Sequence, residues 1–395
     1  MKIGIYGGTF NPIHTGHIHA AKQASGILNL DRLLMIPDRI APHKEIPSGS
    51  PTPEQRLEML QLAVENEPGI AVSDMELKRE GPSYTYLTVE AIRAEYPDAE
   101  LFLLMGTDMF LSFHTWKNPE RITANATLAV MYRGEKGEAD RISARKAEME
   151  AEGVRVVLVK NDTINISSTQ LRRLIAFQCA SEFLPGRVGT YIREKGLYDS
   201  DADWKNLPME QLEPIVVRLL NPNRVAHVLG CRDTAVELAK RWGANEQDAA
   251  RAGILHDITK ALDGPLQLTL CREYGTILDE FGYKYPKTLH ALTGSLVAER
   301  IFGEGEAVVS AICHHTTGKA DMSLLEKIIY VADYMEPNRN FPGVEKLREL
   351  AFSDITAALK LGLEITLQHL ANLGDQVSPA SQAALEFLNR KNISE

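Results

Sequence analysis

The sequence predicts an α/β, Rossmann-like parallel sheet domain over residues 1–200, followed by an all-α helical bundle over residues 206–395. Three observations lead to this prediction. The chain has 395 residues, which exceeds one average domain. Short apolar runs alternate with helical stretches in the first half, whereas the second half has few strand signals. The composition changes in the acidic stretch Asp199–Asp203, where we place the linker.

The first half contains short apolar runs that are typical of buried strands. They are Ile3–Tyr6, Arg32–Ile36, Leu101–Met105, Leu128–Met131 and Val154–Leu158. Pro53–Val64 and Thr85–Glu95, which lie between these runs, carry helix periodicity. Gly134–Glu152 is rich in Glu, Arg, Lys and Ala, so we expect a solvated surface helix there.

The second half is predicted to be helical from its apolar spacing. The expected helices are Leu219–Trp242, Asn245–Leu262, Thr288–Ile301, Glu306–His315 and Leu324–Met335. A bundle of such helices can direct ligand side chains into its core.

Composition limits the possible partners. The formal net charge is −10, which argues against a broad nucleic-acid-binding surface. No run of 18 apolar residues exists, so no membrane span is expected. The chain starts with a strand pattern instead of a signal peptide, and its four cysteines form no CxxC pair. We therefore expect a cytoplasmic protein with reduced thiols, and the sequence leaves homo-oligomer formation open.

The first strand runs into a glycine-rich loop that carries two histidines. The loop reads Gly7-Gly-Thr-Phe-Asn-Pro-Ile-His-Thr-Gly-His17, and a helix follows it. Glycine lets the backbone approach a ligand closely, and a helix start favours phosphate. His14 and His17 are three residues apart, so we expect both rings on one helix face, where they can donate hydrogen bonds to a triphosphate. A lone HxxH is usually incidental, but this strand, loop and helix together favour a phosphate site.

A second helix start carries polar side chains that suit phosphate. Ile166-Ser-Ser-Thr-Gln-Leu-Arg172 follows the strand near Val154–Leu158, and Ser167 with Gln170 fits a capping box. The hydroxyls and the guanidinium of this segment can hold phosphate oxygens. Taken alone, the segment would be better explained as a plain helix cap.

These two motifs resemble those of the HxGH nucleotidyltransferases. Further segments narrow the resemblance to bacterial nicotinate-nucleotide adenylyltransferases over about residues 1–198. They are Pro42-His-Lys44, Gly81-Pro-Ser-Tyr-Thr85, Leu104-Met-Gly-Thr-Asp-Met109, Trp116 and the closing Val188–Tyr198. The resemblance implies that nicotinate mononucleotide attacks the α-phosphorus of ATP, that pyrophosphate leaves, and that Mg²⁺ accompanies ATP.

The resemblance also implies roles for individual residues. The catalytic phosphate ligands would be His14, His17, Lys44 and Arg172. The substrate and ATP contacts would be Gly7, Gly8, Thr9, Phe10, Tyr84, Thr85, Gly106, Asp108, Trp116, Ser167, Ser168 and Thr169. Among these, Tyr84, Thr85 and Trp116 would hold the pyridine ring and its carboxylate. Spacing alone supports only phosphate binding and in-line transfer.

The second half carries histidines and aspartates in an order that suits a metal centre. They are His227, His256, Asp257, His290, His315 and Asp333. Imidazole and carboxylate are usual ligands of Fe, Zn and Mn. Leu255-His-Asp-Ile258 places a His-Asp pair inside an expected apolar helix, where a buried charge requires a partner, and Asp257 could bridge two ions. Each histidine taken alone would more often be a surface or core residue.

This order resembles the HD-domain metal phosphohydrolases over about residues 210–385. Cys313-His-His-Thr-Thr-Gly318 and Ala332–Arg339, followed by Phe341–Val344, are similar to the YqeK-type subgroup, which hydrolyses diadenosine tetraphosphate symmetrically to ADP. The resemblance implies two metal ions, with iron as the expected metal. It selects His315 over His314, because His315 directly precedes Thr-Thr-Gly. Expected phosphate contacts are Lys260, Thr316, Lys319 and Arg339.

Alternatives remain for both halves. The first half could be another HxGH transferase that uses pantetheine phosphate or cytidine triphosphate. The second half could hydrolyse another nucleotide, or it could be a sensing module that binds a nucleotide without hydrolysing it. A scaffolding role would leave both histidine sets unexplained.

Overall fold

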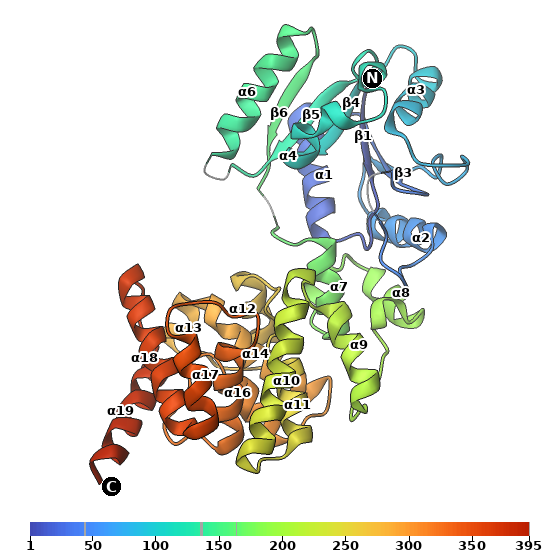
Figure 1. The fold of residues 1–395 in the computed structure, drawn as a ribbon. Coiled ribbons are helices and arrows are strands. Elements are labelled where there is room, and N and C mark those ends of the chain that lie inside the picture. Colours follow the sequence, from blue (N-terminus) through green and yellow to red (C-terminus); the bar gives the residue numbers. More distant parts are fainter. Residues whose placement is uncertain (43–44, 135–136, 163, 395) are drawn as a thin grey trace. The chain divides into compact units, whose positions relative to one another are not determined.

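The computed structural model describes residues 1–42, 45–134, 137–162 and 164–394, and the chain divides into two compact units (Figure 1). The units are Met1–Ala202 and Asp203–Glu395. Lys44, which was predicted to bind phosphate, lies outside the described residues. Within the described residues, none of the helices combines the length and apolar character needed to cross a bilayer.

The first unit is built on a parallel sheet of six strands. The strands are β1 (Lys2–Gly8), β2 (Arg32–Pro37), β3 (Ile70–Val72), β4 (Glu100–Gly106), β5 (Thr127–Tyr132) and β6 (Val156–Lys160). Their order is β3-β2-β1-β4-β5-β6, and every neighbouring pair is parallel. This is a Rossmann-like order, so the predicted fold class is confirmed. The sequence prediction missed β3, because three residues are too short to show a period.

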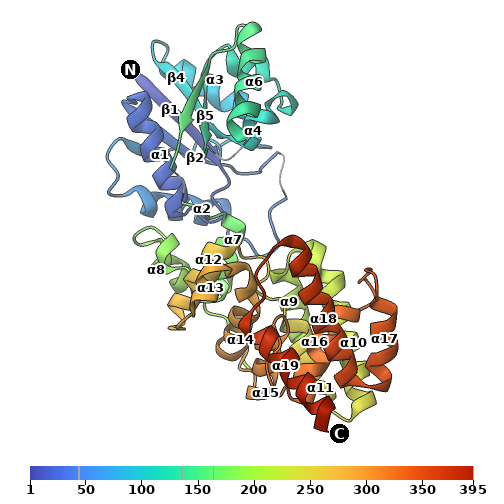
Figure 2. The same ribbon diagram turned by 90° about the vertical axis from the view of Figure 1, so that its left-hand side faces the viewer.

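The first unit has helices on both sides of its sheet and beyond one end of it (Figures 1 and 2). They are α1 (Thr15–Leu28), α2 (Pro53–Val64), α3 (Thr85–Glu95), α4 (Thr107–Leu111), α5 (Pro119–Thr123), α6 (Glu138–Ala151), α7 (Ser168–Ala176) and α8 (Val188–Glu194), with 3₁₀ turns η1 (Phe113–Thr115), η2 (Ser181–Phe183) and η3 (Leu197–Asp199). One apolar cluster joins α3, α4, α5 and α6 to the sheet, and Ile5 and Leu103 are among its strand residues. Leu33 and Met35 alternate with the cluster residues of β2 and are also fully buried, so both faces of the sheet are covered.

The strand order reverses its direction between β1 and β4. From β1 the chain adds β2 and β3 on one side of the sheet, and from β4 it adds β5 and β6 on the other side. In open parallel sheets, ligands bind outside the carboxyl ends of the strands at such a point. Here β1 ends at Gly8 and β4 ends at Gly106, and both glycines belong to predicted binding segments.

The second unit is helical. Its helices are α9 (Met209–Leu219), α10 (Val225–Trp242), α11 (Glu246–Leu255), α12 (Gly264–Glu273), α13 (Glu280–Lys284), α14 (His290–Arg300), α15 (Glu306–His314), α16 (Leu324–Met335), α17 (Val344–Ser353), α18 (Ile355–Leu373) and α19 (Pro379–Ser394), with 3₁₀ turns η4 (Pro222–Arg224) and η5 (Pro286–Leu289). Helix α16 packs against α10, α11, α15, α17 and α18 and is buried almost all round, as its apolar sequence requires. Helices α10 and α11 cross closely at Gly253, where an added Cβ would lie 2.7 Å from the Cα of Arg232.

Two predicted helix boundaries in the second unit are wrong. The expected helix Leu219–Trp242 is interrupted, because α9 ends at Leu219 and the turn η4 precedes α10. The expected helix Asn245–Leu262 stops at Leu255, so His256 and Asp257 lie in the following turns and not inside an apolar helix. There, the Ile258 amide donates to the Leu255 carbonyl and the Lys260 amide donates to the Asp257 carbonyl, three residues back in each case. These turns are tighter than those of an α-helix, so the side chains of His256 and Asp257 point in other directions than a continued α-helix would give them.

Candidate functional sites

The first site is built around the start of α1, where His14 and His17 cap the helix reciprocally. The amide of His17 donates to Nδ1 of His14, and the amide of His14 donates to Nδ1 of His17, both at 3.3 Å. The two rings stack with centroids 3.6 Å apart. Gly16 keeps this arrangement possible, because an added Cβ would lie 3.0 Å from Nδ1 of His14. The structure thus brings the two predicted phosphate ligands together.

The reciprocal cap also determines what the rings can donate. Because Nδ1 of each ring accepts a backbone hydrogen bond, a neutral ring carries its proton on Nε2. Burial lowers the pKa of His14 to about 4, so this ring is neutral at pH 7. His14 therefore offers phosphate an N–H dipole and not a full positive charge.

A cavity of about 340 Å³ lies beside these rings at the carboxyl ends of β1, β4, β5 and β6. It is lined by Tyr6, His14, Gly16, His17, Ala20, Gly106, Met131, Tyr132, Arg133, Asn161, Ile164, Ile166, Ser167, Ser168 and Thr169. The starts of α1 and α7 both open on this cavity, so two sets of helix N–H groups face it. Such a lining suits a polyphosphate.

Side chains of α7 tie this helix to the glycine-rich loop. Ser168 Oγ donates to the carbonyl of Pro12 at 3.0 Å, and Arg172 Nη1 donates to the carbonyl of Asn11 at 2.7 Å. Arg172 Nη2 also contacts the hydroxyl of Thr169 at 3.0 Å. The two predicted motifs therefore form one unit, although about 150 residues of sequence separate them.

A buried arginine that the sequence analysis missed supports the same loop. The Arg56 side chain is fully buried, and its Nη1 donates to the carbonyl of Thr9 at 2.5 Å and to Asp38 Oδ1 at 3.0 Å. Asp38 Oδ2 accepts the hydroxyl of Thr9 at 2.7 Å. Arg56 lies on α2, an ordinary amphipathic helix in sequence, so no local pattern distinguishes it from a surface arginine.

The remaining predicted contacts of the first unit lie on several other segments. Asp108 lines a second cavity of about 370 Å³, which shares Gly106, Met131 and Arg133 with the first. Tyr84 and Thr85 lie at the start of α3, and Trp116 follows η1 and packs on Phe113 with ring centroids 5.3 Å apart. Gly7 and Gly8 are the last residues of β1, Thr9 and Phe10 follow the strand, and the Phe10 ring meets the His17 ring edge-on at 5.2 Å.

The buried state of His14 predicts a pH-dependent stability. Between about pH 6.5 and pH 4 the unfolded chain binds a proton on His14 that the folded chain excludes, so this histidine destabilises the fold as pH falls through that window. His14→Asn keeps a favourable N-cap and removes the titration. We expect the variant to gain up to about 3 kcal/mol of unfolding free energy relative to the unaltered protein between about pH 7 and about pH 4. Urea unfolding of both full-length proteins across this range measures the difference, and parallel pH profiles would contradict the prediction.

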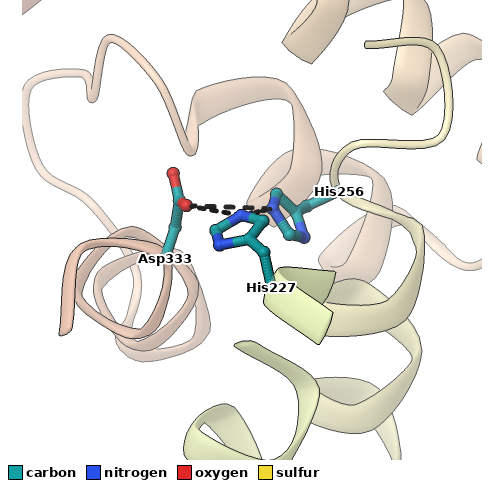
Figure 3. A group of neighbouring side chains, drawn as sticks. All are labelled: His227, His256 and Asp333. Carbon is teal, nitrogen blue, oxygen red and sulfur yellow. Dashed lines mark hydrogen bonds and ion pairs between the residues drawn. The ribbon is translucent and has the colours of Figure 1, made fainter. Parts of the chain in front are cut away.

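The second site lies between α10, α11, α14, α15 and α16, where the predicted histidines and aspartates meet. Figure 3 shows three of them, His227, His256 and Asp333. His227 Nε2 lies 3.1 Å from Asp333 Oδ1 and 3.3 Å from His256 Nε2. The ligand atoms of these three residues lie within 4.8 Å of one another, as do those of His256, Asp257 and His315. His315 is buried in this cluster, whereas His314 pairs with Glu326 at 3.3 Å.

Asp257 lies at the centre of this cluster, and its two oxygens face different histidine pairs. Oδ2 lies 3.7 Å from His227 Nε2 and 3.6 Å from His256 Nε2. Oδ1 lies 3.5 Å from His290 Nε2 and 3.7 Å from His315 Nε2. A carboxylate that faces two sets of nitrogen donors is placed to bridge two ions. The donor set and its burial therefore fit a two-metal centre.

The protonation of the histidines suits metal binding. Burial lowers the pKa values of His256, His290 and His315, so their rings are neutral at pH 7. In each of these rings, Nδ1 lies 2.7 to 3.0 Å from the backbone carbonyl three residues earlier, which leaves Nε2 as the acceptor that faces Asp257. Burial opposes the charge on Asp333, but the hydrogen bond to His227 and the nearby His256 and Arg339 lower its pKa overall.

Cationic and hydroxyl side chains contact the cluster of histidines and aspartates. Lys260 Nζ and Thr316 Oγ1 lie 3.0 and 3.1 Å from His290 Nε2, and Arg339 Nη2 lies 2.5 Å from Asp333 Oδ1. Lys319 pairs instead with the buried Glu326 at 2.7 Å. Arg224, which the sequence analysis missed, donates to Asp257 Oδ2. Its position one helical turn before His227 was the available signal.

Comparisons with known proteins match the two units separately. Residues 5–174 match the cytidylyltransferase-like family, and residues 224–338 match the HD domain. A probable nicotinate-nucleotide adenylyltransferase of Neisseria meningitidis (strain FAM18) is 36% identical over 204 residues, which are 50% of this chain and 98% of the relative. The corresponding protein of Desulfatibacillum aliphaticivorans is 35% identical over 218 residues, covering 50% of this chain and all of the relative.

Solved structures also resemble each half. A predicted HD superfamily hydrolase involved in NAD metabolism from Clostridium acetobutylicum is 34% identical, with a TM-score of 0.46, and the match covers 47% of this chain and 98% of that one. Plasmodium falciparum nicotinic acid mononucleotide adenylyltransferase complexed with NaAD is 17% identical, with a TM-score of 0.41, and the match covers 50% of this chain and 97% of that one.

Proposed function

Since the first half of the chain belongs to the nicotinate-nucleotide adenylyltransferase family, we propose that it transfers the adenylyl group of ATP to nicotinate mononucleotide. The observation that carries the proposal is the cavity onto which the His14–His17 pair and the start of α7 both open. A phosphate oxygen of nicotinate mononucleotide attacks the α-phosphorus of ATP, and the bond to the β-phosphate breaks. The products are nicotinate adenine dinucleotide and pyrophosphate.

The side chains at this cavity would act by positioning and by electrostatics. Nε2–H of each ring would donate to the phosphate oxygens, where negative charge develops during transfer. Arg172 would add a fixed positive charge while its bond to Asn11 holds the loop. Mg²⁺ would arrive with ATP. Lys44 is proposed as a further phosphate ligand, and Tyr84, Thr85 and Trp116 as the contacts of the pyridine carboxylate.

The experiment that tests this proposal measures pyrophosphate release by the full-length protein with ATP. Nicotinate mononucleotide, nicotinamide mononucleotide and pantetheine phosphate are offered as acceptors, and cytidine triphosphate replaces ATP in a parallel series. We expect release with nicotinate mononucleotide and ATP at the highest kcat/KM. If nicotinate mononucleotide gives no release, the proposal fails, and release with pantetheine phosphate would favour the rival transferase.

The second half contains an HD domain, and we propose that it is a metal-dependent phosphohydrolase. The observation that favours this activity is Asp257, whose oxygens face one histidine pair each. The proposed substrate is diadenosine tetraphosphate, to which water adds while the central phosphoanhydride breaks, so that two ADP molecules form. Two ions, for which we propose iron, would supply an activated water and neutralise phosphate charge.

The protein groups around this centre have distinct proposed tasks. His227, His256, Asp257 and Asp333 would hold one ion, and His290 and His315 would hold the other together with Asp257. Lys260, Thr316 and Arg339 lie against the ligand residues and would contact the phosphates. Lys319 would also contact phosphate, and its Nζ lies 2.7 Å from Glu326 Oε1.

Metal analysis combined with product analysis tests this second proposal. The purified full-length chain is assayed for bound Fe, Mn and Zn, and then with diadenosine tetraphosphate and with other dinucleotides. We expect close to two ions per chain and ADP as the product. If the metal-loaded protein bound the dinucleotide but formed no product, the result would support a sensing module instead. If another nucleotide were hydrolysed faster, that nucleotide would be assigned as the substrate in place of diadenosine tetraphosphate.

A further inference from the structure

Glu336 is a buried carboxylate that contacts the metal cluster through only one of its histidines. Its side chain is 1% exposed, and Oε1 lies 3.0 Å from Nδ1 of His227. The residue follows α16 as its C-cap, whereas His227 lies in the first turn of α10, so 109 positions separate the two. Glu336 belongs to neither group of converging ligand atoms.

His227 differs from the other histidines of the cluster in how its Nδ1 is held. His256, His290 and His315 each place Nδ1 against a backbone carbonyl three residues earlier, so their orientation is set locally. His227 instead places Nδ1 3.0 Å from the carboxylate of Glu336, which follows α16 and is distant in sequence. A carboxylate accepts the Nδ1 proton, so Nε2, which lies 3.1 Å from Asp333 Oδ1 and 3.7 Å from Asp257 Oδ2, is the nitrogen left for a metal ion.

The surroundings hold Glu336 in this position. The backbone amide and the side-chain amide of Asn338 donate to Oε2 at 2.7 and 2.8 Å. Gly230, one turn after His227 on α10, leaves the space that the carboxylate occupies, because an added Cβ would lie 2.6 Å from Oε2. Both oxygens of Glu336 are therefore used, one to hold the carboxylate and one to orient the ring.

From these contacts we infer that Glu336 is a positioning residue, which fixes the tautomer and direction of His227 so that Nε2 can ligate a metal ion. The inference rests on the proposed metal centre. It predicts that loss of the Glu336 carboxylate weakens metal binding by about 10- to 100-fold, which is the range typical of residues that orient a metal-binding histidine. Because the amide of glutamine carries no negative charge and can present an N–H to Nδ1, Glu336→Gln should not replace the carboxylate fully.

The test uses the full-length protein after metal removal and titrates Mn²⁺, and separately Zn²⁺, by calorimetry. Glu336→Gln removes the negative charge, and Gly230→Ala places a methyl group where Oε2 lies. Both substitutions should lower the affinity for the metal ion. Glu326→Gln is the matched control, because Glu326 is equally buried and also pairs with a histidine, His314, that lies outside the cluster. The metal affinity of Glu326→Gln should stay within about 2-fold of that of the unaltered protein. Adenylyl transfer by the first half of the same chain verifies that each preparation is intact.

A second readout separates positioning from a general loss of structure. Selective ¹⁵N labelling of histidine reports which ring nitrogen is protonated in the metal-free protein. In Glu336→Gln the His227 signals should change, while those of His256, His290 and His315 stay in place. Unchanged affinity in Glu336→Gln would overturn the inference, and so would weakened affinity with unchanged His227 signals. If the unaltered protein bound neither ion, the proposed metal centre itself would fail, which is a distinguishable result.

Discussion

Replacing His17 with alanine should lower kcat/KM for adenylyl transfer on the order of 10³-fold. The variant removes one of the two stacked rings whose Nε2–H groups can donate to the triphosphate. A preorganised donor aimed at developing charge typically contributes this much to the rate. The rate of pyrophosphate release, measured over a range of nicotinate mononucleotide and ATP concentrations, gives the value.

A stability measurement on the variant and one control variant separate chemistry from the loss of the helix cap. His17→Ala also removes half of the reciprocal cap, which should cost about 1 kcal/mol of unfolding free energy without lowering kcat itself. His19→Ala alters a histidine of the same helix that pairs with Gln23 and does not line the cavity, so its kinetics should be normal. If His17→Ala retained full kcat/KM, the assignment of this ring to phosphate would be wrong.

Replacing His256 with alanine should remove both the bound metal and the phosphohydrolase activity. His256 is fully buried and belongs to both groups of converging ligand atoms, so no neighbouring side chain can take its place. We expect metal content to fall, and hydrolysis of diadenosine tetraphosphate to drop by more than about 10²-fold, the upper end for residues that only orient a ligand. Metal analysis and ADP formation are measured on the same preparation.

The chain offers its own controls for this experiment. Adenylyl transfer by the first half should be unaffected, and His314→Ala should keep its metal because His314 points to Glu326. An active His256→Ala variant without metal would refute the ligand assignment. A variant that kept its metal and lost activity would assign His256 to the chemistry and not to the ion.

The parts of the fold that could be predicted are those with a strong local signal. Five of the six strands are continuous apolar runs, and α2, α3 and α16 begin and end where their apolar spacing indicates. Strand β3 has only three residues and no period to detect. The predicted helix through His256 and Asp257 was wrong, because side-chain spacing does not distinguish an α-helix from the tighter turns that follow Leu255.

The candidate sites divide in the same way. Histidines and aspartates in a recognisable order were found from the sequence, and the structure brings the ring nitrogens and carboxylates of the second set together. Arg56, Arg224 and Glu336 were missed, since their contacts join residues that are 47, 33 and 109 positions apart. Arg224 precedes a predicted ligand by one helical turn, but Arg56 and Glu336 carry no motif of their own. Their roles become visible only when their partners are placed beside them.

The reciprocal cap of α1 has a consequence for how this protein could evolve. Asp, Ser and Asn are the residues that best begin a helix, but His14 occupies that position and is kept from taking a proton. If the ring serves phosphate as proposed, the side chain that would best stabilise the helix and the one that binds the ligand are different residue types. Stabilising substitutions at this position would then lower activity, so we expect a screen for stability alone to select variants that have lost adenylyl transfer.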